Sequence, residues 1–147
     1  ITFSTDIIVG FPGEREEDFA ETLSIVEEAG FDDAYTFKYS VREGTPAEKI
    51  KDHVPDAVAS ERLDRLIATA RAQTRRRNAG RVGERHEVLV ERPAKRGDLM
   101  LGRTRHNAMV LVDLPVSSIG TYHQVRLTGT TGSTFTAALA QPALAVL

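Results

Sequence analysis

The residues best suited to binding a polyanion gather in the C-terminal half of the chain. Residues 103–107 read Arg-Thr-Arg-His-Asn, and a strand would place the two arginines on one face. The histidine and asparagine that follow can stack on a base or hydrogen-bond to it at a turn. This pattern favours a groove for a nucleic-acid backbone, and a solvated protein face is the alternative. The residues expected in the groove are Lys95, Arg96, Arg103, Arg105, His106 and Asn107, with Arg126 on a later strand.

Three consecutive arginines, Arg75, Arg76 and Arg77, stand near the expected end of a helix. Cations at that position complement the helix dipole and need no ligand. Three in a row exceed what a helix end requires, so phosphate contact is an equally good interpretation. We include them among the expected RNA-binding residues.

A second group of residues lies near the N-terminus, where predicted strands end. Residues 10–14 read Gly-Phe-Pro-Gly-Glu and form a turn between a strand and a helix, a place where ligands meet α/β sheets. The turn lacks the spacing and the Lys-Ser/Thr ending of a triphosphate-binding loop, and a plain tight turn is the alternative. Arg42 follows the next strand, and its planar guanidinium could bind a carboxylate or phosphate.

The residue types also exclude several chemistries. The 147 residues include no cysteine, so the chain itself can form no thiol nucleophile, disulfide, cysteine zinc site or cysteine-bound iron–sulfur cluster. The histidines show no metal-ligand spacing and no carboxylate companions, and we predict no metal site. These histidines are His53, His86, His106 and His123.

The elements that would position the N-terminal group are a strand, a helix and a second strand. Residues 4–11 form a near-continuous apolar run, which predicts a strand buried on both faces. Acidic residues from Glu14 onward and apolar residues at helical spacing predict a helix that ends at Gly30. Residues 34–40 predict the next strand, and the helical crossover implies that the two strands are parallel.

A two-stranded parallel unit cannot cover its own apolar faces, and the chain begins with Ile1 rather than Met. We therefore expect a C-terminal piece of a longer polypeptide, whose missing N-terminal portion supplies the rest of an α/β sheet or barrel. After Pro55, a narrow apolar stripe predicts a helix that reaches about Arg77.

The remaining residues change to short alternating segments separated by turn residues. The pattern predicts five strands and a small, closed or nearly closed barrel of the oligonucleotide-binding kind. The predicted strands are residues 86–92, 99–104, 108–114, 122–128 and 134–139. The fold class is therefore α/β plus all-β.

Charge is distributed unevenly along the chain. Residues 1–61 hold 15 acidic and 5 basic residues, whereas residues 62–147 hold 6 and 14, so the net charge of −2 conceals balances of −10 and +8. This asymmetry favours a polyanion-binding C-terminal part, although two unlike domains could differ in the same way. No apolar run approaches the length that spans a bilayer and no signal peptide is evident, so we expect a cytoplasmic protein without a membrane partner.

Three strings in register carry a family resemblance: residues 5–14 (TDIIVGFPGE), 37–46 (FKYSVREGTP) and 102–107 (GRTRHN). Together they resemble the C-terminal half of the radical SAM methylthiotransferases. The resemblance implies that residues 1–50 are the C-terminal strand–helix–strand portion of a radical SAM α/β barrel. Residues 51–80 would be a linker helix, and residues 81–147 a TRAM RNA-binding barrel resembling an oligonucleotide-binding fold.

The string variants resemble the tRNA-modifying branch, which adds a 2-methylthio group to N6-isopentenyladenosine at tRNA position 37. The resemblance implies S-adenosylmethionine and two 4Fe-4S clusters as cofactors, and the anticodon stem–loop of tRNA as partner. The cluster ligands are cysteines that this chain lacks, so the chain alone should be inactive. The residues implied near the cofactor are Gly10, Phe11, Gly13, Glu14, Tyr39, Ser40 and Arg42. Val41 and Glu43 stand where the family often has proline.

Two alternatives remain open at this point. The chain could be a stand-alone RNA-binding module, with residues 1–50 acting only as scaffold. It could also come from the sister branch of the family, which modifies a ribosomal protein and whose barrel serves a protein partner.

Overall fold

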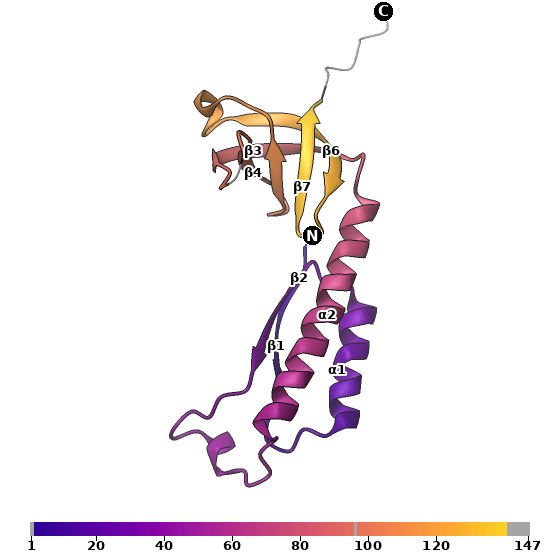
Figure 1. The fold of residues 1–147 in the computed structure, drawn as a ribbon, viewed down its shortest axis with the longest axis vertical. Helices are drawn as coiled ribbons and strands as arrows, with labels where there is room; N and C mark the ends of the chain where they lie inside the picture. Colours follow the sequence, from indigo (N-terminus) through magenta and orange to yellow (C-terminus); the bar gives the residue numbers. More distant parts are fainter. Residues whose placement is uncertain (1, 96, 141–147) are drawn as a thin grey trace, which may run out of the picture. The chain divides into compact units, whose positions relative to one another are not determined.

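A computed structural model describes residues 2–95 and 97–140, which form two compact units, Ile1–Thr74 and Arg75–Leu147 (Figure 1). The first unit contains β1 (Ser4–Val9), α1 (Glu16–Ala29), β2 (Asp33–Lys38), the 3-10 helix η1 (Pro46–Lys49) and most of α2 (Asp56–Gly80). The second contains the end of α2, then β3 (Arg85–Pro93), β4 (Met100–Thr104), β5 (Met109–Val112), the 3-10 helix η2 (Val116–Ser118), β6 (Tyr122–Thr130) and β7 (Thr134–Leu139). Among the described residues, no helix is long and apolar enough to span a membrane.

Local sequence explains both ends of α1. The backbone N–H of Arg15 donates to Asp18 Oδ2 at 2.8 Å, and three acidic residues occupy the first turn, where the helix dipole favours negative charge. The helix ends at Gly30, which adopts the left-handed conformation with φ of 60°. The predicted helix is confirmed.

β1 and β2 pair in parallel, as predicted, with Ile8 opposite Phe37. The face that carries Ile7 and Val9 packs against α1 and α2, where Phe19, Val26 and Leu66 are buried (Figure 1). The expectation that the first strand is buried on both faces is wrong within the described residues. On the opposite face Ile8 is 55% exposed and Phe37 50% exposed, because the two helices of this unit lie on one side only.

α2 begins directly after Pro55, as predicted, and extends to Gly80, three residues beyond the expected end. Leu66 is fully buried and Leu63 packs against the same cluster. The apolar stripe did not predict that Arg62 also turns inward, where it is 5% exposed.

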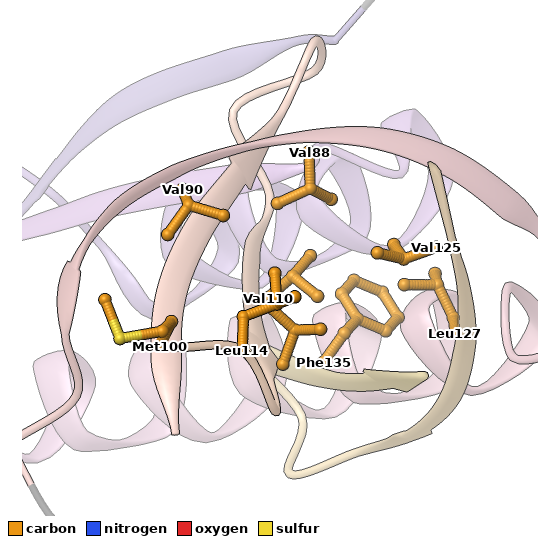
Figure 2. Close-up of a cluster of buried hydrophobic side chains, with 9 residues drawn as sticks. Val88, Val90, Met100, Val110, Leu114, Val125, Leu127 and Phe135 are labelled. Atoms are coloured by element: carbon orange, nitrogen blue, oxygen red, sulfur yellow. The ribbon is translucent and has the colours of Figure 1, made fainter. Parts of the chain in front are cut away.

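The five predicted strands are all present, and they form a closed barrel in the order β3-β4-β5-β7-β6. All neighbouring strands are antiparallel except β5 and β7. Figure 2 shows the core of the barrel, in which valines, leucines, Met100 and Phe135 point into the interior. Phe135 is fully buried. A Cβ on Gly102 would lie 2.4 Å from Val88 Cγ1, so a side chain at this position would collide with the opposing strand.

Candidate functional site

The turn between β1 and α1 holds the first group of predicted site residues. Gly10 and Gly13 both have positive φ, 74° and 85°, which glycine adopts without steric cost. The N–H of Gly13 donates to Asp52 O at 2.6 Å, and that of Glu14 donates to Phe11 O at 2.9 Å. A Cβ on Gly10 would lie 2.5 Å from Ala59 Cβ, so the turn sits directly against α2.

Glu14 points back into the turn rather than outward. Its Oε2 accepts from the N–H of Gly10, and the guanidinium of Arg62 donates to the same oxygen at 3.2 Å. Arg62 also donates to the backbone O of Glu14 at 3.1 Å. Both side chains are nearly inaccessible, with 6% of Arg62 and 10% of Glu14 exposed. This buried ion pair fixes the shape of the turn, and sequence reasoning missed Arg62 because nothing in the helical pattern distinguishes it from a surface arginine.

A second, exposed ion pair continues the network. Arg62 donates to Glu16 Oε2 at 3.4 Å, and Arg65 donates to Glu16 Oε1 at 2.7 Å. The hydrogen bond from Arg65 lowers the pKa of Glu16 below its ordinary value. Both guanidinium groups lie over the ring of Phe19, at 5.6 and 4.7 Å from its centroid.

Phe11 and Tyr39 come together at the carboxyl ends of β1 and β2. Their ring centroids are 5.1 Å apart in an edge-to-face arrangement, and Phe11 is 44% exposed. The hydroxyl of Tyr39 is buried and has no hydrogen-bond partner among the described residues. An orphaned hydroxyl beside an exposed ring is what the edge of a small-molecule site would present.

Ser40 and Arg42 follow Tyr39 on the same loop, and both are exposed. Thr45 closes this loop by donating from Oγ1 to the backbone oxygen of Arg42 at 2.8 Å. The predicted cofactor residues thus lie at the same edge of the β1–β2 pair, where such sheets bind ligands. The described residues include no group of histidine, aspartate or glutamate side chains that could hold a metal ion.

The arginines of the 102–107 string lie on β4 and in the turn after it. Arg103 Nε donates to Glu91 Oε2 at 3.2 Å, and one terminal nitrogen of Arg103 donates to Asn107 Oδ1 at 2.7 Å. Arg105 lies beyond the end of the strand, 84% exposed, with Nε 3.7 Å from Glu87 Oε1. The two arginines are therefore close in the chain, but each one faces a carboxylate of β3.

The other predicted RNA-binding residues occupy several elements of the second unit. His106 is exposed, and its ring lies 6.5 Å from that of His86. Lys95 is exposed after β3, and Arg96 falls outside the described residues. Arg75, Arg76 and Arg77 are exposed on α2. Arg126 is exposed on β6 and donates from Nε to Gly83 O at 3.1 Å.

No protein-family model matches the chain. The curated relatives that it resembles include three proteins named tRNA-2-methylthio-N(6)-dimethylallyladenosine synthase. The protein of Acetivibrio thermocellus is 48% identical over 128 residues, 86% of this chain and 27% of the relative. That of Clostridium botulinum is 44% identical over 128 residues, 86% of this chain and 28% of the relative. That of Geobacillus thermodenitrificans is 46% identical over 147 residues, 99% of this chain and 28% of the relative.

The chain spans little more than a quarter of the length of these curated relatives. The identity of 44–48% extends over 86–99% of this chain. The chain is similar in sequence to part of the proteins named tRNA-2-methylthio-N(6)-dimethylallyladenosine synthase.

Proposed function

We propose that the chain is part of a tRNA methylthiotransferase of the radical SAM class, which adds a 2-methylthio group to N6-isopentenyladenosine at tRNA position 37. The observation that carries this proposal is the identity of 44–48% to synthases of that name. S-adenosylmethionine and two 4Fe-4S clusters would supply the radical and sulfur chemistry when bound. Because the chain contains no cysteine, its own residues would bind and orient rather than hold the clusters.

The first unit would form part of the wall of the radical SAM barrel. Ile8 and Phe37 are half-exposed on its uncovered sheet face. The rest of the polypeptide would cover this face and complete the barrel. Phe11, Tyr39 and Arg42 would border the cofactor pocket, where Arg42 can bind a carboxylate or phosphate. The Glu14–Arg62 pair would hold the turn that carries Phe11 in place.

The second unit would dock the anticodon stem–loop of the tRNA. A small closed barrel is a common scaffold for oligonucleotides, and 14 of the 19 basic residues follow Glu61. Arg103, Arg105 and Asn107 lie in one segment at the surface of this barrel. The relatives are named as tRNA enzymes, and no observation favours a ribosomal-protein substrate or a stand-alone module.

Binding of a labelled anticodon stem–loop to the chain, followed by fluorescence anisotropy, tests the docking role. Affinity should fall by roughly a decade or more between about 50 and 200 mM salt if several cations neutralise phosphates. The pair Arg103→Ala and Arg105→Ala should weaken binding while circular dichroism shows a folded barrel. Unchanged affinity in that folded double variant would contradict the assignment of these two residues, and no binding by the unaltered chain would contradict the docking role.

In the full-length protein, mass analysis of tRNA tests the activity. Cells that carry the gene should contain the 2-methylthio derivative, and cells that lack it should accumulate the unmodified N6-isopentenyladenosine. Unchanged tRNA in the deletion strain would refute the proposed reaction.

A further inference from the structure

A shallow hollow of about 320 Å³ opens on the outer surface of the barrel. This volume lies at the lower end of the range for small-molecule sites, roughly 300–1,000 Å³. Its lining comes from β3, β4, β5, β7 and the adjoining turns. The residues that line it are Arg92, Ala94, Lys95, Leu101, Leu111, Thr131 and Thr134.

The floor of the hollow is apolar because two outward-facing leucines lie side by side. Leu101 of β4 pairs directly with Leu111 of β5. Their chain neighbours Met100, Val110 and Val112 point into the barrel core, so strand alternation directs both leucines outward. Leu101 is 7% exposed and Leu111 is half-buried, so the accessible aliphatic surface of the floor comes mainly from Leu111.

A β-bulge brings Arg92 to the rim of this floor. The register of β3 against β4 shifts between Val90 and Arg92, so that Val90 pairs with Gly102 and Arg92 with Leu101. Val90 is fully buried in the core, and strict alternation would direct residue 92 inward as well. The extra residue in the bulge reverses that direction, and Arg92 is exposed beside the outward-facing Leu101.

The two cations at the rim differ from the arginines of the 102–107 string. Arg103 and Arg105 each face a carboxylate, at 3.2 and 3.7 Å. Arg92 and Lys95 are exposed and have no ion pair with any residue that the structure describes. None of the described residues that line the hollow is acidic. These two cations can therefore neutralise an external anion without first breaking an internal pair.

The combination of an aliphatic floor, two free cations and two threonine hydroxyls matches the chemistry of one nucleotide. A base can pack against apolar side chains, and the nucleotide's phosphate can bind Arg92 and Lys95. The hydroxyl of Thr134 can hydrogen-bond to the ribose or the base edge, and that of Thr131, which donates to Thr134 O at 3.3 Å, can still accept. We propose that this hollow is a subsite for one unpaired nucleotide of the bound RNA. The proposal rests on the proposed function, because it assumes that the barrel docks RNA.

The test measures the binding of the 147-residue chain to two labelled RNAs. One is an anticodon stem–loop, and the other is a fully paired duplex of the same length. Leu111→Thr removes part of the floor but no charge, so binding of the stem–loop should weaken about fivefold with an unchanged salt slope. Binding of the duplex should not change. Leu139→Thr is the matched control, because Leu139 is an exposed leucine on β7 outside the hollow.

The charge of the rim is tested separately. Arg92→Ala combined with Lys95→Ala should reduce the salt slope for the stem–loop by roughly 1.4, which corresponds to two single-strand phosphates. Arg85→Ala is the control, since Arg85 is an exposed arginine at the other end of the same strand. Its effect on the slope should be small.

The outcomes separate the two proposals. If the unaltered chain binds the stem–loop but the hollow variants behave like their controls, the nucleotide subsite is refuted while RNA docking stands. If the Leu111→Thr effect is equal for stem–loop and duplex, the site does not require an unpaired base, and the proposal is again refuted. If the chain binds neither RNA at low salt, the docking role itself fails.

Discussion

The two units of this protein differ in how the edges and faces of their sheets are covered. The barrel closes on itself, so that each of its five strands has two neighbours and its apolar side chains share one interior. The parallel pair β1–β2 has two strands only, with helices on one face and exposed Tyr35 and Phe37 on the other. An exposed apolar face is typical of a surface that another part of a protein covers.

This difference indicates which interactions stabilise each unit. In the barrel, the buried side chains form one continuous apolar cluster. In the α/β unit, a smaller apolar cluster is joined by a buried ion pair and a glycine packed against a helix. We therefore expect apolar truncation to be most damaging in the barrel, and polar or steric changes at one turn to be most damaging in the first unit.

Truncation of matched phenylalanines provides the largest contrast. Phe135→Ala removes a fully buried ring from the barrel core and should cost about 3–5 kcal/mol of unfolding free energy. Phe37→Ala removes a ring that is 50% exposed on the open sheet face and should cost less than about 1 kcal/mol. Hydrogen exchange resolved by peptide measures each unit separately. Equal losses would show that the sheet face is covered in solution.

Removal of Arg62 should be the largest polar effect in the first unit. Arg62→Ala leaves the carboxylate of Glu14 buried without its cation and should destabilise this unit by about 3 kcal/mol. Arg65→Ala is the control, because Arg65 is 43% exposed and pairs with the exposed Glu16, so its effect on stability should be much smaller. Exchange rates in peptides from residues 8–18 report the difference. Similar effects for both variants would argue against a structural role for the buried pair.

Alanine substitution of two glycines measures the close approach of the turn to α2. Gly13→Ala imposes only the cost of a positive φ, about 1–2 kcal/mol, because nothing lies within 4 Å of the new Cβ. Gly10→Ala adds a contact at 2.5 Å with Ala59 Cβ and should cost about 1 kcal/mol more. Chemical denaturation of both variants provides the comparison. Equal free energies of unfolding would mean that α2 can move away from the new Cβ without strain.

The smallest expected effect concerns an exposed pair in the second unit. His86 Nε2 lies 2.8 Å from Glu84 Oε2, and this hydrogen bond, with a contribution from Arg81, lowers the pKa of Glu84 below its ordinary value of 4.5. A lowered pKa in the folded state means that the stabilisation exists above pH 4.5 and is lost as the pH falls through the folded value.

Glu84 is 47% exposed, so the contribution should be no more than about 0.5 kcal/mol. In Glu84→Gln, the decrease in barrel stability below pH 4.5 should therefore be smaller by that amount. Thermal unfolding at several pH values measures it. An identical pH profile in the variant would show that the pair does not stabilise the folded state.

Much of the secondary structure could be predicted from local pattern. Phe19 and Leu23 at helical spacing predicted α1, and Gly30 predicted its end, because helix termination is a local property of the backbone. Alternating apolar residues such as Val88 and Val90 predicted the barrel strands. The sequence also predicted that two parallel strands cannot cover their own apolar faces, but not which face of β1 the helices cover, because that depends on tertiary packing.

Two side chains at the candidate sites illustrate what local pattern cannot supply. Arg62 lies on a helix rich in arginine, and only the packing of α2 against the β1–α1 turn makes it a buried partner of Glu14. Arg92 would face inward by alternation, and only the bulge in β3 directs it outward. The first outcome depends on a contact between segments far apart in the chain, and the second on the register between two consecutive strands.

The sequence by itself determined the order of the α-helices and strands, the separation of an acidic part from a basic part, and the absence of cysteine ligands. These are properties of residue type and spacing. The tertiary structure alone decided that Arg103 and Arg105 face carboxylates of β3, whereas Arg92 and Lys95 border an apolar hollow. The physical reason is that strand register and barrel closure determine which charges become neighbours, and a charge that already has a partner offers less to a ligand than one that has none.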